Sequence, residues 1–245
     1  MLYRHSPCRT SISAATRIIP ASLIALLIGV SSPSPGAAAA PPWPDTPRAR
    51  LAALALIQTL NAELLSSSSA TLTLERWCRS HALAEPAQIL ARRIDTTQAV
   101  ASETIRQDLQ VSAQEPIQYR RVELRCGEHL LSIADNWYVP ARLTPAMNRS
   151  LATTQAPFGK VVQPLSPHRE TLAMKLLWSP LPDGWERTAG RSAVAAIVSH
   201  DLEVPAALFE HRALLHTSTH QPIAEVHEVY QRDILAFPEP QLPAR

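Results

Sequence analysis

Alternating apolar and polar side chains predict a β-strand over residues 118–126, QYRRVELRC. Side chains in a strand point alternately to its two faces, so one face carries an apolar row that begins with an arginine. That row is Arg120, Val122, Leu124 and Cys126. After a turn at Gly127, residues 130–139 predict a second strand that pairs with the first as a hairpin. Similar stretches bring the expected strands to about six: residues 169–178, 193–200, 209–216 and 223–230.

Before these strands, apolar residues recur at the spacing of an α-helix. Over residues 49–65 they fall on one stripe of a helical surface, which predicts an amphipathic helix. Residues 70–83 predict a second, shorter helix, and another is expected over residues 140–151. Residues 88–94 mix helical and alternating patterns, and residues 102–110 fit either a short helix or an exposed edge segment. Helices that precede the strands of one sheet indicate an α+β protein.

The N-terminal part has the composition of a secretory signal peptide, which we assign to residues 1–39. Arg4, Arg9 and Arg17 precede an apolar run that ends at Val30, and small residues follow it. Because this run is shorter than the roughly 20 residues that a membrane-spanning helix needs, a cleaved signal is favoured over an uncleaved anchor. We expect cleavage after residue 39 and a periplasmic or secreted protein without a membrane span.

The mature chain predicts one domain with few cysteines. Prolines make residues 40–50 an extended linker, residues 51–237 form the domain, and residues 238–245 form a C-terminal tail. A length of roughly 200 residues is enough for one well-buried core, and we expect a monomer. Cys78 and Cys126 remain after the signal is removed. In an oxidising compartment they would form a disulfide; the alternative is a pair of buried thiols that act as small apolar residues.

Composition argues against several kinds of partner and cofactor. The formal net charge is +2, with 46% hydrophobic and 18% charged residues, so a nucleic-acid-binding surface is not indicated. The chain has no Walker A, GxGxxG, HExxH or CxxC motif. His216 and His220 have the spacing of a helical metal-ligand pair, but they lie at a turn between expected strands. We therefore expect no metal and no cofactor.

Two charged residues stand on otherwise apolar strand faces. Arg120 begins the row described above, and Glu228 falls in the apolar row of the last strand, whereas Glu225 points away. Arg212, which shares a strand face with Leu214, is a further candidate. A buried charge is costly unless it is paired, so Arg120 and Glu228 are partners either of each other or of a ligand. An arginine binds a carboxylate through two N–H groups, and a buried glutamate can protonate a leaving oxygen or hold a hydroxyl.

Four short motifs occur in the order found in the chorismate lyase family. RRVELRCGEHLLSIADNWYVP resembles its strand pair, in which an arginine is followed by x-V-x-L, a glycine turn and an alanine-containing strand closed by V-P. APFGKVV is similar to its P-L-G loop, with Phe158 in place of the leucine. QPIAEVHEVY resembles its last strand, and LLSSSSATLTLERW resembles the helix, loop and helix near its start. The resemblance covers about residues 51–235, nearly the whole mature chain.

The resemblance implies a fold, a reaction and a set of site residues. Chorismate lyase has an antiparallel sheet covered by helices and helical flaps, and it eliminates pyruvate from chorismate to leave 4-hydroxybenzoate without a cofactor. By position, Arg120 would hold a carboxylate and Glu228 would lie at the hydroxyl or ether oxygen as the catalytic pair. The other implied substrate contacts are Ala70, Phe158, Gly159, Arg169 and Arg212. The alignment of Glu228 needs a shift of one residue, so Glu225 remains a rival for its role.

Two functions remain open at this point. The first is a chorismate-lyase-like enzyme that acts on chorismate or a related enolpyruvyl compound. The second is an exported, non-catalytic protein that binds a small aromatic carboxylate on the same fold. That fold also serves as the ligand-binding domain of GntR-type transcription regulators. Because an export signal would carry the chain away from cytosolic chorismate, the second function is weighed beside the first.

Overall fold

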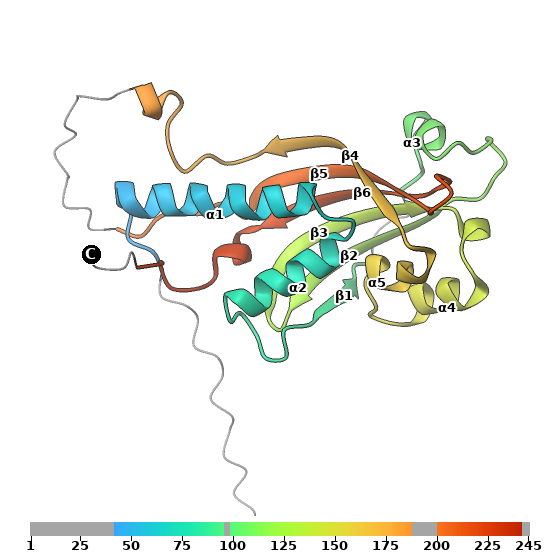
Figure 1. Cartoon of the computed structure of the whole chain (residues 1–245), viewed down its shortest axis with the longest axis horizontal. Coiled ribbons are helices and arrows are strands. Elements are labelled where there is room, and N and C mark those ends of the chain that lie inside the picture. Colours follow the sequence, from blue (N-terminus) through green and yellow to red (C-terminus); the bar gives the residue numbers. More distant parts are fainter. Residues whose placement is uncertain (1–41, 96–98, 188–199, 242–245) are drawn as a thin grey trace, which may run out of the picture. The chain divides into compact units, whose positions relative to one another are not determined.

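An antiparallel sheet is the centre of the structure, a computed structural model that describes residues 42–95, 99–187 and 200–241. Within these residues, six strands pair in the order β1-β2-β3-β6-β5-β4 (Figure 1). Their bounds are β1 Ile89–Arg93, β2 Gln118–Cys126, β3 His129–Tyr138, β4 His168–Leu176, β5 Ala207–His216 and β6 Pro222–Gln231. The expected α+β class with one antiparallel sheet is therefore confirmed.

The strands differ from expectation in two places. The undecided stretch at residues 88–94 contains the edge strand β1, which pairs with β2. The strand expected over residues 193–200 lies almost wholly outside the described residues. The other expected strands agree with the structure to within two residues at each end, and β2 and β3 pair as the expected hairpin.

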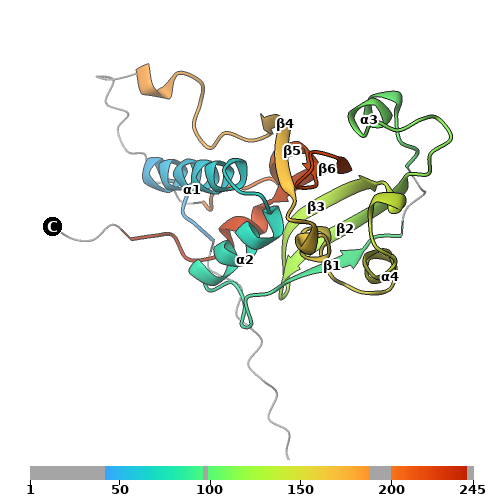
Figure 2. The same cartoon turned by 45° about the vertical axis from the view of Figure 1, so that its right-hand side comes forward.

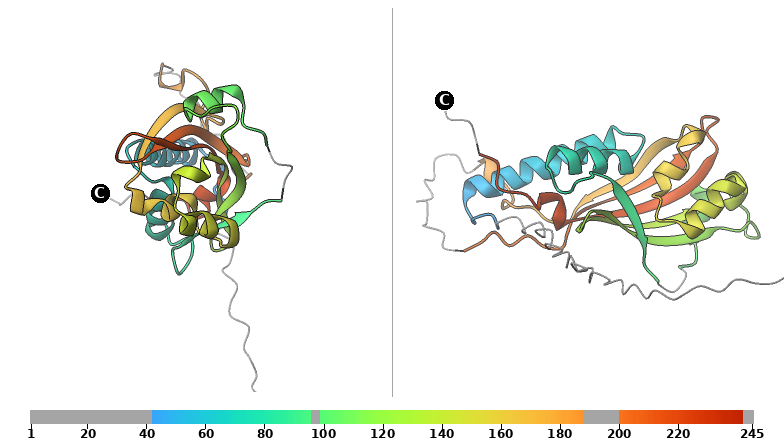
Figure 3. Two further views of the ribbon diagram at one scale, coloured as in Figure 1. Left: turned by 90° about the vertical axis from the view of Figure 1, so that its right-hand side faces the viewer. Right: turned by 90° about the horizontal axis from the view of Figure 1, so that it is seen from below.

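Two helices, α1 (Pro47–Leu65) and α2 (Ala70–Ser80), lie along one side of the sheet, as the view from below in Figure 3 shows. Each begins at a capping side chain, because Thr46 and Ser69 accept hydrogen bonds from N–H groups of the first turns. Helix α1 begins inside the segment expected to be an extended linker. That expectation is wrong from Pro47 onward, because proline fits the first turn of a helix.

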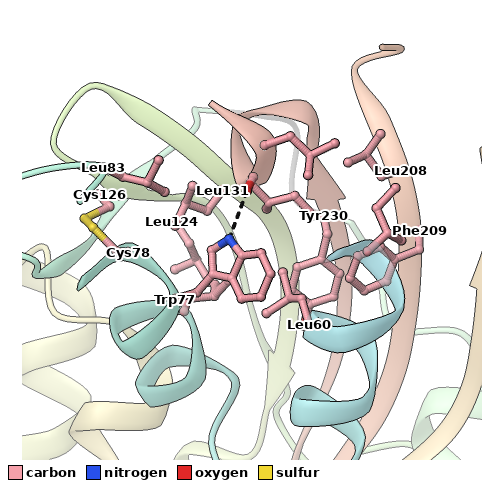
Figure 4. Close-up of a cluster of buried hydrophobic side chains, with 14 of the residues drawn as sticks. Leu60, Trp77, Cys78, Leu83, Leu124, Cys126, Leu131, Leu208, Phe209 and Tyr230 are labelled. Carbon is pink, nitrogen blue, oxygen red and sulfur yellow. Dashed lines mark hydrogen bonds between the residues drawn. A yellow bond between two sulfur atoms is a disulfide. The ribbon is translucent and has the colours of Figure 1, made fainter. Parts of the chain in front are cut away.

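The core between these helices and the sheet is drawn in Figure 4. Leu60 of α1 packs in one cluster with Trp77 of α2 and with Phe209 and Tyr230 of the sheet. The rings of Phe209 and Tyr230 stack with centroids 4.5 Å apart, and Trp77 Nε1 donates to the Ile234 carbonyl at 2.9 Å. Each large apolar side chain buried in this way stabilises the fold by about 1.5–3 kcal/mol. The core thereby fixes α1 and α2 against the sheet.

A disulfide between Cys78 and Cys126 joins α2 to the end of β2 (Figure 4). The two residues are 48 positions apart in the sequence. Of the two alternatives left open by the sequence, the structure contains the bridge. It ties the helical cover to the strand that carries Arg120.

The remaining helices are short. They are α3 Glu103–Asp108, α4 Pro145–Thr153 and α5 Phe158–Val161, with 3-10 turns at Pro140–Arg142, Gln163–Leu165, Trp185–Arg187 and Arg232–Leu235. Figure 2 shows α2, α5 and α4 in front of the sheet and α3 apart from them. Helix α4 matches the helix expected after Pro140, and α3 settles the undecided stretch at residues 102–110. Among the described helices, none combines the length and the apolar composition of a membrane span.

The register of the central strands places the candidate charges on one face. Arg120 of β2 lies opposite Asn136 of β3, which lies opposite Val226 of β6. Two residues along the strands, the next row is Val122, Ala134 and Glu228. Residues directly opposite one another point to the same face of a sheet. Arg120 and Glu228 therefore share a face, as the alternation predicts.

Candidate functional site

A narrow cavity, which we call the sheet cavity, lies between this face and the first turns of α2 and α5. Its floor is apolar and consists of Val122, Leu124, Ala134, Leu215 and Val226. The polar side chains that line it include Ser69, Thr71, Asn136, Arg169 and Glu228. Its volume of about 30 Å³ is room for a few water molecules. The cavity is thus closed to anything larger in this conformation.

Glu228 lies in the sheet cavity as one half of a buried ion pair. Its Oε2 accepts a hydrogen bond from Arg169 Nη2 at 2.7 Å and another from the Tyr230 hydroxyl at 3.0 Å. Its other oxygen, Oε1, accepts no hydrogen bond from the described residues. Glu228 therefore offers a ligand one free acceptor on a carboxylate whose charge Arg169 already balances.

The ion pair changes the acidity of the groups around it. Burial alone would lower the pKa of the Arg169 guanidinium, but the charge and hydrogen bond of Glu228 raise it above its ordinary value. Burial, followed by the Glu228 charge, raises the pKa of the Tyr230 hydroxyl well above its ordinary value. His211 lies opposite Glu228 in β5, and burial lowers its pKa to about 4, so the imidazole is neutral at pH 7. Its Nε2 is 2.8 Å from Asn61 Oδ1 of α1.

Arg120 lies on the same face as Glu228, opposite Asn136 of the cavity lining, but it is not itself among the lining residues and does not pair with Glu228. Both terminal nitrogens donate to the Ala156 carbonyl at 3.2 Å, and its buried Nε has no partner among the described residues. Burial, and then the charge of Arg93, lower the pKa of Arg120 to about 10. Within the described part of the chain, Arg120 is a buried cation that forms no ion pair with a carboxylate.

Three further residues that the sequence resemblance implied are found in the lining of the cavity: Ala70, Phe158 and Gly159. Gly159 marks the point where α5 meets the start of α2. A Cβ atom on Gly159 would lie 3.1 Å from both Ser69 Oγ and Thr71 Oγ1. Glycine therefore permits the close contact that shuts the cavity.

Arg212 is the implied substrate contact that the structure places elsewhere. It lies opposite His227, on the face away from the sheet cavity. Its Nε is 3.0 Å from Glu225 Oε1, and its Nη2 donates to Asp108 Oδ2 at 2.8 Å. Arg212 does share a face with Leu214, but Leu214 is buried in a small apolar cluster on this other face. Grouping Arg212 with the cavity was wrong, and Glu225, the rival of Glu228, lies with it.

Two polar residues of the cavity, Thr71 and Asn136, were missed in the sequence. Asn136 is 3% exposed and stands between Ala134 and Tyr138 on the inward row of β3. A polar side chain in an apolar row is a signal of a site that the alternation pattern could have revealed. Within the described residues its side chain makes no hydrogen bond, so its amide is free for a ligand. In that same part of the chain, no group of three or more His, Cys, Asp or Glu side chains could hold a metal ion.

The fold and the site together define an α+β domain with a small buried cavity on one face of an antiparallel sheet. No family model matches the chain. The chain is 48% identical over 201 residues to "Uncharacterized protein y4mC" of Sinorhizobium fredii (strain NBRC 101917 / NGR234), covering 82% of this chain and 84% of that protein. The chain therefore belongs to the same family as that protein.

Solved structures show more distant similarity. The effector domain of PhnF from Mycobacterium smegmatis is 13% identical, with a TM-score of 0.42 and coverage of 68% of this chain and 90% of that chain. A transcriptional regulator (GntR family) from Enterococcus faecalis V583 is 9% identical, with a TM-score of 0.37 and coverage of 63% and 99%. Similarity at this level carries no conclusion about what the present chain does.

Proposed function

We propose that the sheet cavity binds a small organic acid that also carries a hydroxyl group. Two unsatisfied groups on one face of the sheet carry this proposal: the free Oε1 of Glu228 and the buried Arg120, whose Nε has no partner among the described residues. A ligand hydroxyl would donate to Glu228. A ligand carboxylate would neutralise Arg120, whose buried charge is otherwise costly.

The spacing of these two residues suits a ligand of about one aromatic ring. Arg120 and Glu228 are two strands and two residues apart in the register of β2, β3 and β6. With ~4.8 Å between strands and ~3.3 Å per residue, their Cα atoms are roughly 12 Å apart. Two inward side chains and one ring-sized molecule can bridge that distance, over the apolar floor of the cavity.

Binding a molecule of this size requires the cavity to widen. Its cover consists of the first turn of α2 and the helix α5, which has four residues and no side-chain cap. The resemblance to chorismate lyase implies helical flaps in the same position. We propose that this cover moves away to admit the ligand and then closes over it.

A chorismate-lyase-like elimination is the second candidate, because Arg120 and Glu228 share one face as that resemblance implies. However, Glu228 pairs with Arg169 and also accepts a hydrogen bond from Tyr230. Both contacts are made to Oε2, which leaves Oε1 as an acceptor for a ligand hydroxyl. Glu228 is therefore better suited to hold a hydroxyl than to protonate a leaving oxygen, and we place binding without turnover first.

The binding proposal is tested by titrating the purified protein with 4-hydroxybenzoate and with benzoate, which lacks the hydroxyl, in a calorimeter. We expect 4-hydroxybenzoate to bind about tenfold more tightly, since it alone donates to Glu228. Arg120→Gln and Glu228→Gln should each weaken its binding by about tenfold or more. The control is Arg79→Gln on the exposed side of α2, which should bind like the original protein. Equal binding of the two acids, or binding of neither, would refute the proposal.

Incubation with chorismate separates the two candidate functions. Release of 4-hydroxybenzoate that Arg120→Gln abolishes would establish the lyase. Binding of 4-hydroxybenzoate with no release from chorismate would establish the binding protein. The same purified preparation serves for both measurements, so a negative result in one is not a difference in folding.

We also propose that residues 1–39, which lie outside the described residues, are a cleaved export signal. The Cys78–Cys126 disulfide supports this, because such bonds persist mainly in oxidising compartments. Mass spectrometry of exported protein should find an N-terminus at Ala40; an intact Met1 would contradict cleavage.

A monomer is likewise our proposal, and light scattering should give the mass of one chain.

A further inference from the structure

A second pocket, which we call the outer pocket, opens on the face of the sheet away from the sheet cavity. It is lined by Trp137, Lys175, Glu210, Arg212, Glu225 and His227, which come from four strands. Its volume is about 310 Å³, compared with about 30 Å³ for the sheet cavity. It contains charged residues that the proposed function does not use.

Glu225 of the outer pocket is a buried carboxylate with one unsatisfied oxygen. The residue is 2% exposed, and its Oε1 lies 3.0 Å from Arg212 Nε. Its Oε2 is buried and has no hydrogen-bond donor among the described residues. Burial raises the pKa of Glu225, Arg212 opposes this effect, and the Asp108 carboxyl adds to it. A buried acceptor without a donor is uncommon in proteins and calls for a specific explanation.

Arg212 does not fully compensate Glu225, because a second acid shares it. Its Nη2 donates to Asp108 Oδ2 at 2.8 Å. On another part of the pocket lining, His227 Nε2 is 3.3 Å from Glu210 Oε2. Two carboxylates thus share one arginine, which leaves one negative charge of this group uncompensated, while Lys175 is exposed. Among the described residues, Glu225 Oε2 is a buried acceptor without a donor, and Arg212 Nε beside it is a buried N–H group that also lacks a hydrogen-bond partner.

We infer that the outer pocket binds a small organic cation with a primary ammonium group. Its N–H groups would donate to Glu225 Oε2, which supplies the missing donor, and its charge would balance the second of the two carboxylates that share Arg212. The Trp137 ring in the lining gives an aromatic surface of the kind that organic cations favour. A metal ion suits the pocket less well, since no suitable group of three ligand side chains occurs in the described part of the chain.

The inference is tested with 2-phenylethylamine as the probe and 2-phenylethanol as a matched compound without the charge. Binding to the full purified protein is followed by calorimetry and by the NMR signal of the Trp137 indole N–H. We expect the amine to bind at least tenfold more tightly than the alcohol, and Glu225→Gln to weaken the amine by about tenfold. Trp137→Leu should weaken it by about two- to fivefold, as expected for a partly exposed cation–π contact.

Glu228→Gln is the control that separates the two sites. It should weaken 4-hydroxybenzoate and leave 2-phenylethylamine unchanged, so the outer pocket can fail or succeed independently of the proposed function. Equal binding of amine and alcohol, or unchanged binding of the amine to Glu225→Gln, would overturn the inference. So would the absence of binding at ~10 mM amine, because an affinity weaker than that does not indicate a specific site. If Glu225→Gln does not fold, Glu210→Gln and Trp137→Leu decide the result.

Discussion

The two faces of the sheet hold their charged residues in different ways. On the cavity face, the side chains of Arg169 and Glu228 are 3% and 8% exposed and lie 2.7 Å apart. On the outer face, the Arg212 side chain is 40% exposed and is shared between Glu225 and Asp108. A buried pair is costly to break because each charge is left without water, whereas water can replace a partner that is partly exposed.

This difference indicates what kind of binding each face can support. The sheet cavity has a volume of only about 30 Å³, so under the proposed function a ligand must displace the cover formed by α2 and α5. The outer pocket is open, so a ligand can enter without rearranging the core. Binding there should also weaken more with added salt, because exposed charges are screened more strongly.

The largest effect is expected from Arg169→Met on the cavity face. The substitution leaves Glu228 buried without its cationic partner, which should reduce the free energy of unfolding by about 3–5 kcal/mol. Urea denaturation gives the value. On the outer face, Arg212→Met should cost less, because Arg212 is partly exposed and because Glu225, whose pKa burial already raises, can take up a proton when it loses its partner. Similar losses in the two variants would show that the faces do not differ as the burial indicates.

The double variant Arg169→Met/Glu228→Leu sharpens the same comparison. With both charges removed, neither member of the pair is left buried without its partner, and the Tyr230 hydroxyl loses the acceptor that Glu228 gave it. Most of the loss caused by Arg169→Met should therefore be recovered. A double variant as unstable as the single one would mean that packing, and not charge, sets the cost.

The second effect concerns the disulfide that holds the cover of the cavity face. Replacing Cys78 and Cys126 by alanine should lower the free energy of unfolding by about 2–4 kcal/mol, through the freedom gained by the unfolded chain. Because the bridge is remote from the outer pocket lining, 2-phenylethylamine should bind the folded variant as before. Unchanged stability in a chemical denaturation curve would argue that the bridge does not form in solution.

The fold could be predicted further from the sequence than the partners of the site residues. Alternation placed Arg120 and Glu228 on one face, because a half-buried strand has period two and the apolar row marks the inner side. It could not show that Glu228 pairs with Arg169, since that contact joins β4 and β6 across β5. Strand order is a tertiary property, and a single strand pattern does not contain it.

The errors have a physical cause as well. Arg212 was grouped with the cavity because Leu214 beside it is apolar, but the sheet buries apolar residues on both faces. Strand β1 was undecided because it is a short edge strand with only two buried residues. The start of α1 was missed because the prolines before it were taken as a linker, while Pro47 opens the helix.

The third effect is a pH dependence that belongs to the cavity face. The pKa of His211 is lowered by burial from 6.5 to about 4. Between these values the unfolded chain binds a proton that the folded protein does not, so stability present above pH 6.5 is lost as the pH falls toward 4. We expect this histidine to account for about 3 kcal/mol of that loss. The free energy of unfolding, measured by denaturation at several pH values, should depend less steeply on pH in His211→Gln than in the original protein.

The smallest effect on stability is expected from Gly159→Ala. The new Cβ would meet Ser69 Oγ and Thr71 Oγ1 at 3.1 Å, so the start of α2 must shift slightly. Alanine also restricts the unfolded chain, which offsets part of the cost, and the net change should stay within about 1 kcal/mol. Since the same contact closes the sheet cavity, 4-hydroxybenzoate should bind several-fold more weakly, whereas 2-phenylethylamine should be unaffected. Equal weakening of both ligands would mean that the variant disturbs the whole sheet, and that the two faces are not independent.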